Sequence, residues 1–94
     1  MRLIYCPNLF VFDQVCYIVD EQNDYQIIKF KMDEMEESLL NICNEYKIYD
    51  IVLSGKNNGF YLNQIKHDIE KCAETKYNLT DIKITIQEQE NIYV

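Results

Sequence analysis

The spacing of the hydrophobic residues changes several times along this chain, and this change constrains the fold more than any other feature. Between residues 28 and 32 apolar side chains alternate with lysines, as in a strand with one buried face. Between residues 35 and 46 they recur at intervals of three and four, as in an amphipathic helix. Both patterns return later in the chain. A sequence with both periods is expected to build one core from strands and helices packed together.

Applied to the whole chain, these patterns predict the order β-β-β-α-β-α-β and an α/β domain with a mixed sheet. The first three segments lie close together and are expected to form an antiparallel meander, whereas helices separate the later strands, which favours parallel pairing. Asp33 and Glu36 are expected to form a capping box at the start of the first helix. The predicted strands are 2–6, 9–19, 25–32, 48–53 and 82–86, and the predicted helices are 33–47 and 62–78.

This order of elements resembles the core of the ribonuclease H-like fold, in which three antiparallel strands precede an α-β-α-β segment. The resemblance is one of element order and covers about 88 residues. The alternative is a ferredoxin-like sheet, with a split β-α-β unit and one extra amino-terminal strand. Either fold gives a single domain at 1–88 and a short tail at 89–94.

Residues for common types of catalysis are not found where that chemistry needs them. A two-metal nuclease with this fold has a carboxylate on its first strand, whereas residues 3–6 read Leu-Ile-Tyr-Cys. Asp13 and Asp50 are expected at the wrong ends of their strands. His67 falls off the apolar stripe of its helix, and the four scattered cysteines lack the paired spacing of zinc sites. We therefore expect no enzyme activity, catalytic residue, metal or cofactor.

The compartment is expected to be the cytoplasm, without membrane contact. The longest apolar-dominated stretch, 9–19, is too short to cross a bilayer, and the amino terminus lacks the apolar run of a signal peptide. In a reducing compartment the four cysteines are expected to be free and mostly buried.

Charge indicates the kind of partner. Sixteen acidic and nine basic residues give a net charge of −7, which disfavours direct nucleic-acid binding and favours a protein with a basic surface. The acidic excess is concentrated in 33–47, with five acidic residues and one basic, and in 81–94, with three and one. Part of the first cluster is explained by the helix dipole. The predicted partner-binding residues are Asp33, Glu34, Glu36, Glu37, Glu88 and Glu90.

The leading hypothesis is a non-catalytic, acidic protein-binding module. Its small size and acidity are similar to those of virus- or mobile-element-encoded inhibitors of nucleic-acid-handling host machinery, including anti-CRISPR proteins. One alternative is a small-ligand or nucleotide site in the glycine-containing segment Gly55, Lys56, Asn57, Asn58 and Gly59.

Another alternative is a degenerate nuclease-like structural subunit. Phe10 and Phe12 are expected in one strand with Leu9 and Val11 between them, which makes both faces of that strand apolar. Such a strand is either central in the sheet or a contact surface, so these two residues are the candidates for homodimer contact.

Overall fold

The computed structural model describes residues 1–56 and 59–89, with only the backbone described at 56, 59, 60, 88 and 89. These residues form five strands, two α-helices and one short 3-10 helix, in the predicted order β-β-β-α-β-α-β. The elements are β1 (Arg2–Tyr5), β2 (Asp13–Val19), β3 (Tyr25–Lys31), η1 (Met32–Glu34), α1 (Met35–Tyr46), β4 (Asp50–Lys56), α2 (Gly59–Lys76) and β5 (Lys83–Gln89).

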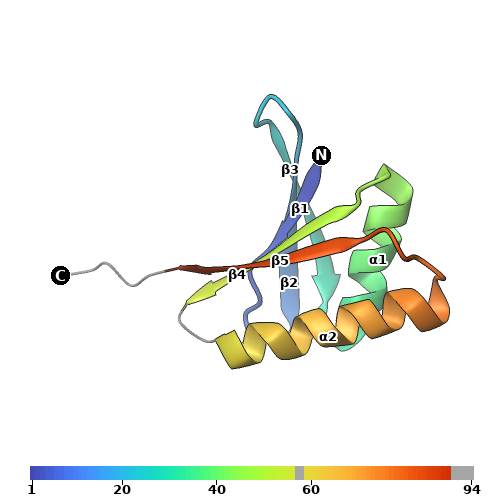
Figure 1. The fold of residues 1–94 in the computed structure, drawn as a ribbon. Coiled ribbons are helices and arrows are strands. Elements are labelled where there is room, and N and C mark those ends of the chain that lie inside the picture. The colour runs from blue at the N-terminus through green and yellow to red at the C-terminus, as the bar shows by residue number, and fades with distance from the viewer. Residues whose placement is uncertain (57–58, 90–94) are drawn as a thin grey trace.

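The strands form one mixed sheet in the order β3-β2-β1-β4-β5. β1, β2 and β3 pair antiparallel, whereas β1 pairs parallel with β4, and β4 with β5. The sheet is strongly twisted, so that β5 runs almost across the direction of β1 and β2 (Figure 1). β4 and β5 are direct neighbours, whereas a split β-α-β unit would leave another strand between them. The ferredoxin-like alternative is therefore wrong.

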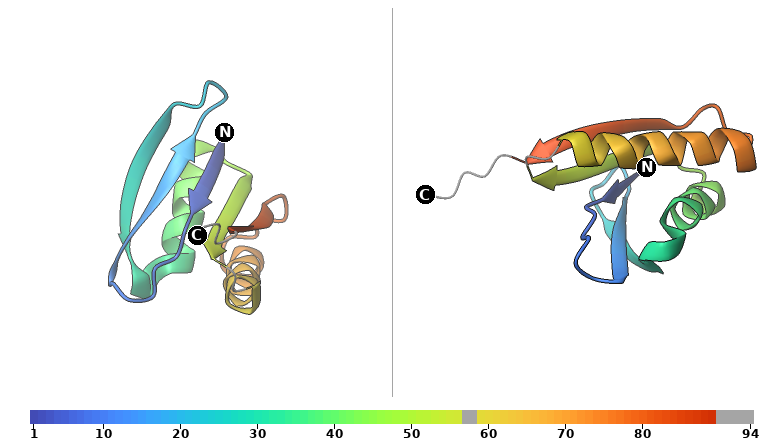
Figure 2. Two further views of the ribbon diagram at one scale, coloured as in Figure 1. Left: turned by 90° about the vertical axis from the view of Figure 1, so that its left-hand side faces the viewer. Right: turned by 90° about the horizontal axis from the view of Figure 1, so that it is seen from below.

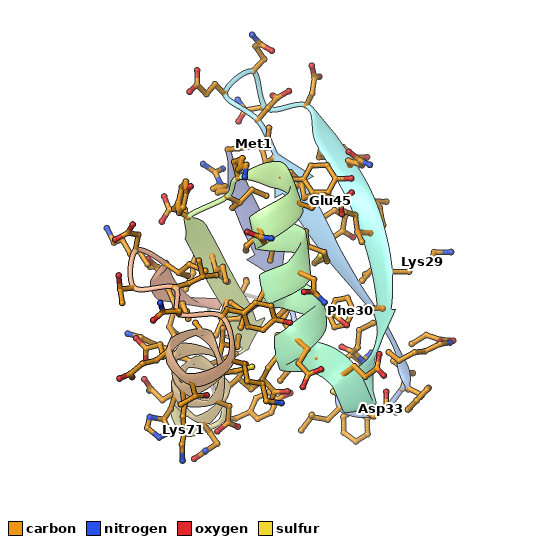
Figure 3. The ribbon with its side chains drawn as sticks, turned by 90° about the vertical axis from the view of Figure 1, so that its right-hand side faces the viewer. Met1, Lys29, Phe30, Asp33, Glu45 and Lys71 are labelled. Atoms are coloured by element: carbon orange, nitrogen blue, oxygen red, sulfur yellow. The ribbon has the colours of Figure 1, made fainter. Side chains whose placement is uncertain are left out.

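Both helices cover the same face of the sheet. α2 lies along β4 and β5, and α1 packs across the earlier strands (Figure 2). Buried strand residues lie opposite one another in the pairing register, as Leu3 does with Ile18 and Ile51, so they share this face. Figure 3 shows Phe30 pointing toward α1 and Lys29 pointing away from it. No helix in the described ranges has the length and apolar character needed to cross a membrane.

The other face of the sheet, here called the open face, is not covered by any element within residues 1–56 and 59–89. Its central side chains are apolar, and Val15 and Ile27 are 38% and 51% exposed. Its charged residues lie toward the ends of the strands. Those whose side chains the structure describes are Arg2, Asp13, Lys29, Lys31, Asp50 and Lys83, all exposed.

Three local predictions were wrong. Residues 9–12 are not a strand, because the ladder of β2 with β3 begins at Asp13. Asp33 does not cap a helix: it lies inside η1, and Glu34, the residue before α1, makes no side-chain capping hydrogen bond. β4 continues through Lys56, so Ser54–Lys56 pair with β5 in the sheet.

Candidate functional site

Charge is divided between the two layers of the molecule. The helix layer, meaning η1, α1 and α2, carries eight acidic residues and three lysines. Of the open-face side chains that the structure describes, four of the charged ones are basic and two are acidic, and Asp13 is ion-paired with Lys31. The net charge of −7 is therefore not spread evenly, because the helix layer is acidic and the open face is slightly basic. This division depends on the packing of segments that are distant in sequence.

A shallow groove between α1 and α2, here called the helix groove, brings several acidic residues together. Its volume is about 310 Å³, and its lining includes Glu36 and Glu37 from α1 and Asp68 from α2. Lys71 and Lys76 line the α2 side. Glu36 and Glu37 were predicted as binding residues, whereas Asp68 was missed. Its place beside them follows from helix packing, and no sequence signal indicated it.

Polar contacts hold the two helices together at this groove. Lys76 Nζ lies 2.6 Å from Glu37 Oε1, and this hydrogen bond raises the pKa of Lys76. The hydroxyl of Tyr77 donates to Asn41 Oδ1 at 2.9 Å. Gln64 Nε2 donates to Asp68 Oδ1 at 3.1 Å, which orients that carboxylate. The groove is thus a fixed surface feature, although Glu37 is already partly neutralised by its lysine.

Asp33 and Glu34 lie beside the helix groove, at the transition from η1 to α1, and both are exposed. Neither makes a capping hydrogen bond within the described residues. Their position at a helix amino terminus is favourable because the backbone N–H groups there carry partial positive charge. The helix dipole therefore explains why these charges are tolerated here. Because both side chains are exposed, they are accessible to a partner.

A second feature is the connection between β1 and β2, where Leu9, Phe10, Val11 and Phe12 are all exposed; we call residues 9–12 the apolar loop. Phe10 is 96% exposed, which is unusual for a phenyl ring. Apolar side chains in sequence normally predict a buried strand, but here the backbone turns them toward solvent. The loop is not a continuation of β2.

Gln14 holds the apolar loop in place. Its side chain is 2% exposed and forms four hydrogen bonds. Oε1 accepts from the hydroxyl of Tyr5 at 2.8 Å and from the N–H of Asn8 at 3.1 Å. Nε2 donates to the carbonyls of Asn8 at 2.7 Å and Val11 at 2.9 Å. Burial raises the pKa of Tyr5 far above its ordinary value, so its hydroxyl remains a donor.

Two further bonds complete the loop. Asn8 Oδ1 accepts from the N–H of Phe10 at 3.1 Å, and the N–H of Met32 donates to the carbonyl of Phe12 at 2.9 Å.

Beside the loop lies a groove of about 730 Å³, here called the loop groove. The apolar loop forms one wall of the groove, and Gly55 and Leu62 contribute another.

The residues predicted for ligand binding occupy several environments. Gly55 lies in β4, and a Cβ placed there would be 3.2 Å from both methyl carbons of Leu62. Close packing against α2 therefore explains this glycine without a phosphate. Lys56 ends β4, Gly59 begins α2, and Asn57 and Asn58 lie outside the described residues.

Other predicted positions are now located. Asp13 begins β2 at the carboxyl end of β1, whereas Asp50 begins β4 at the amino end of β1, so the two carboxylates lie at opposite ends of the sheet. A hydrogen bond from Lys31 lowers the pKa of Asp13. His67 is exposed. Glu88 is described only by its backbone in β5, and Glu90, with the rest of the predicted tail after residue 89, lies outside the described residues.

The four cysteines are free; Cys16 and Cys43 are buried, Cys72 is partly buried and Cys6 is exposed. Burial raises the pKa of Cys16 to about 11 and that of Cys43 to about 12. Among residues 1–56 and 59–89, no three His, Cys, Asp or Glu side chains are grouped so that they could hold a metal ion.

Comparisons with protein-family models, with curated proteins and with solved structures give no match.

Proposed function

We propose that this chain is a non-catalytic protein-binding module whose helix layer binds a basic surface on another protein. The observation that carries the proposal is the division of charge, with eight acidic residues and three lysines on η1, α1 and α2. Opposite charge on a partner would favour association and orientation at this layer. The contact would centre on Asp33, Glu34 and Glu36, with Asp68 at its margin.

The fixed geometry of the helix groove supports this proposal. Because hydrogen bonds and an ion pair tie α1 to α2, a partner would not have to order the groove on binding. A lysine or arginine side chain could lie along the groove with its charged end near Glu36 and Asp68. Glu37 would contribute less, since Lys76 already pairs with it.

A more specific form of the proposal is an inhibitor of nucleic-acid-handling machinery, such as a virus or mobile element encodes. Such machinery binds phosphates in basic clefts. An acidic helix layer could occupy a cleft of this kind by presenting carboxylates to it. The proposed core is ribonuclease H-like, supported by three antiparallel strands followed by α1-β4-α2-β5. The separation of Asp13 from Asp50 supports a non-catalytic role for that core.

The test is affinity capture from the native cell lysate, after nuclease treatment, with three baits. One is the unaltered protein, and one carries Glu34→Lys and Glu36→Lys. The matched control carries Glu21→Lys and Asp24→Lys in the β2–β3 turn, which makes the same change in net charge away from the helix layer. Circular dichroism confirms that all three baits are folded.

The proposal predicts a stoichiometric protein that the unaltered and control baits retain, that the Glu34/Glu36 bait loses, and that elutes with added salt. Equal retention by all three baits would show that the helix layer is not the binding surface. A partner lost from both charge-reversed baits would point to net charge alone, which would also contradict a specific site.

A further inference from the structure

We propose that an extended, basic segment of the partner protein adds as a further strand along the outer edge of β3, antiparallel to it, with its basic side chains on the side of α1. This inference rests on the proposed function for the basic character of the partner, and it adds the way in which that partner binds. It starts from an edge strand with exposed backbone groups and from acidic side chains beside that edge.

The outer edge of β3 exposes backbone groups at every second residue. β3 is the first strand in the sheet order, and no strand within residues 1–56 and 59–89 pairs with its other side. Bonded and non-bonded residue pairs alternate along an antiparallel ladder. The N–H of Met32 donates to the carbonyl of Phe12, and the register makes the other bonded residues of β3 even-numbered as well. The N–H and C=O groups that point outward therefore belong to Tyr25, Ile27, Lys29 and Lys31.

A groove of about 620 Å³ lies beside this edge, and we call it the edge groove. Its lining comes from both faces of the sheet, with Lys29 and Lys31 on the open face and Phe30 on the helix side. Glu34 and Ser38 continue the lining on the helix side. Phe30 is the single buried residue of β3, so most of this strand is uncovered. A strand bound along the edge would cover it, as in other complexes formed by strand addition.

The helix side of the edge is acidic. Glu34 lines the edge groove, and Ser38 and Glu45 share a side of α1 because they are seven residues apart, about two helical turns. Gln26 Nε2 donates to the hydroxyl of Tyr46 at 3.4 Å, which places the carboxyl end of α1 against β3. Glu34 and Glu45 are exposed, and neither forms an ion pair within the described residues. Lysine or arginine side chains on this side of an added strand would meet opposite charge.

The open side of the edge favours a different kind of side chain. Lys29 points away from α1 (Figure 3), and Lys31 is paired with Asp13. Tyr25 and Ile27 are 66% and 51% exposed on the same face. A basic side chain here would face Lys29, whereas valine or threonine would cover Ile27. The edge therefore selects a segment in which basic and β-branched residues alternate.

Fluorescence anisotropy with a labelled synthetic peptide tests this edge. The peptide is Thr-Lys-Val-Lys-Val-Lys-Thr, blocked at both ends. In the antiparallel arrangement its valine amides face β3 and its lysine amides face solvent. Methylation of the valine nitrogens should therefore block binding, and methylation of the lysine nitrogens is the matched control. A peptide with glutamate in place of every lysine tests the charge preference.

Four protein variants accompany the peptides. Ile27→Pro removes an outward N–H that the fold does not use, and Ile27→Thr, which keeps that N–H, is its matched control. Glu45→Lys reverses a charge beside the edge. Asp68→Lys makes the same change in the helix groove, on α2. Thermal unfolding confirms that each variant is folded.

The lysine peptide should bind the unaltered, Ile27→Thr and Asp68→Lys proteins with similar affinity. Ile27→Pro and methylation of the valine nitrogens should each weaken binding by at least about tenfold, because each removes a backbone hydrogen bond and adds bulk at the edge. The glutamate peptide and Glu45→Lys should weaken it by about three- to tenfold, and less at high salt. Amide exchange at Ile27 and Lys29 should slow when the peptide binds, while Ile28 exchanges slowly throughout.

Four results would overturn the inference. They are no binding of the lysine peptide up to about 1 mM, binding that Ile27→Pro leaves unchanged, equal loss on methylating valine or lysine nitrogens, and fast exchange of Ile28 in the free protein. Self-association of the unaltered protein that Ile27→Pro abolishes would also contradict it, because a second copy would then occupy the edge.

Affinity capture with an Ile27→Pro bait separates this inference from the proposed function. A partner that this bait retains and the Glu34→Lys, Glu36→Lys bait loses would support binding by the helix layer and refute strand addition. A partner that only the Ile27→Pro bait loses would support the edge of β3 and refute the helix layer as the binding surface.

Discussion

Replacement of Gln14 by leucine would remove the side chain that joins β1 to the apolar loop. The hydroxyl of Tyr5 would lose its acceptor, and Tyr5 is 0% exposed, so no solvent replaces it. A buried donor left without a partner costs about 1–3 kcal/mol. The three bonds from Gln14 to the loop backbone can be replaced in part by water, and we assign them about 0.5 kcal/mol each. The expected loss in the free energy of unfolding is about 2–5 kcal/mol.

Urea unfolding followed by circular dichroism measures this loss, and a double-mutant cycle with Tyr5→Phe identifies its source. Tyr5→Phe alone should cost about 1 kcal/mol, the usual value of one hydrogen bond. In the Tyr5→Phe background, Gln14→Leu leaves no buried hydroxyl without an acceptor. The loss in unfolding free energy caused by Gln14→Leu should therefore be smaller by about 1–2 kcal/mol. Hydrogen exchange at Asn8 and Phe10 should also accelerate. A Gln14→Leu cost below about 0.5 kcal/mol, or an equal cost in both backgrounds, would refute the role given to Gln14.

Three further predictions concern the core. The raised pKa values of the Cys16 and Cys43 thiols, about 11 and about 12, mean that the unfolded chain releases these protons at lower pH than the folded chain. The contribution of these two thiols to stability should therefore be constant between about pH 6 and pH 8 and fall by on the order of 2 kcal/mol by pH 10, and a flat profile in urea unfolding over pH 8–10 would contradict this. Iodoacetamide at pH 8 should modify Cys6 in the native protein well before Cys16 or Cys43, as peptide mass spectrometry can show; equal rates would contradict the burial described here. Gly55→Ala should cost about 1–2 kcal/mol in thermal unfolding because its Cβ would crowd Leu62, and Leu62→Val should relieve part of that cost; additive effects would argue against this contact.

The order of the elements was predictable because each buried face left a regular pattern. Ile28 and Phe30 alternate with lysines in β3, and Leu39 and Cys43 recur at helical spacing in α1. The order of the strands within the sheet was harder to predict, since the sequence pattern alone does not indicate which strands pair. The position of β4 between β1 and β5 is a result of the structure.

The apolar loop was predicted wrongly because its residues favour strands and nothing local shows that they face solvent. Leu9 to Phe12 would extend β2, but hydrogen bonds from the buried Gln14 hold the backbone in another path. Pro7-Asn8 and a glutamine in an apolar run were the available signals. β4 was predicted too short because Gly55 suggested a loop. Gly55 instead lies within β4, where the absence of a side chain lets Leu62 of α2 pack closely against the strand.

The candidate site was predictable only in part. Asp33, Glu34 and Glu36 were identified from local charge density, which sequence displays directly. Asp68 joins the helix groove because α1 packs beside α2, and the basic character of the open face follows from the strand register. Both depend on contacts between distant segments, which a single sequence does not reveal.

The separation of an acidic helix layer from a slightly basic open face gives the molecule a permanent electric dipole across its thickness. A charged surface would orient the protein before contact. This orientation acts over distances comparable to the Debye length, about 8 Å at physiological ionic strength. On an anion-exchange matrix the molecule should therefore adsorb by its helices and leave the sheet accessible. Immobilisation through an amine on the open face, such as that of Lys29, would present the helix layer outward in a binding assay.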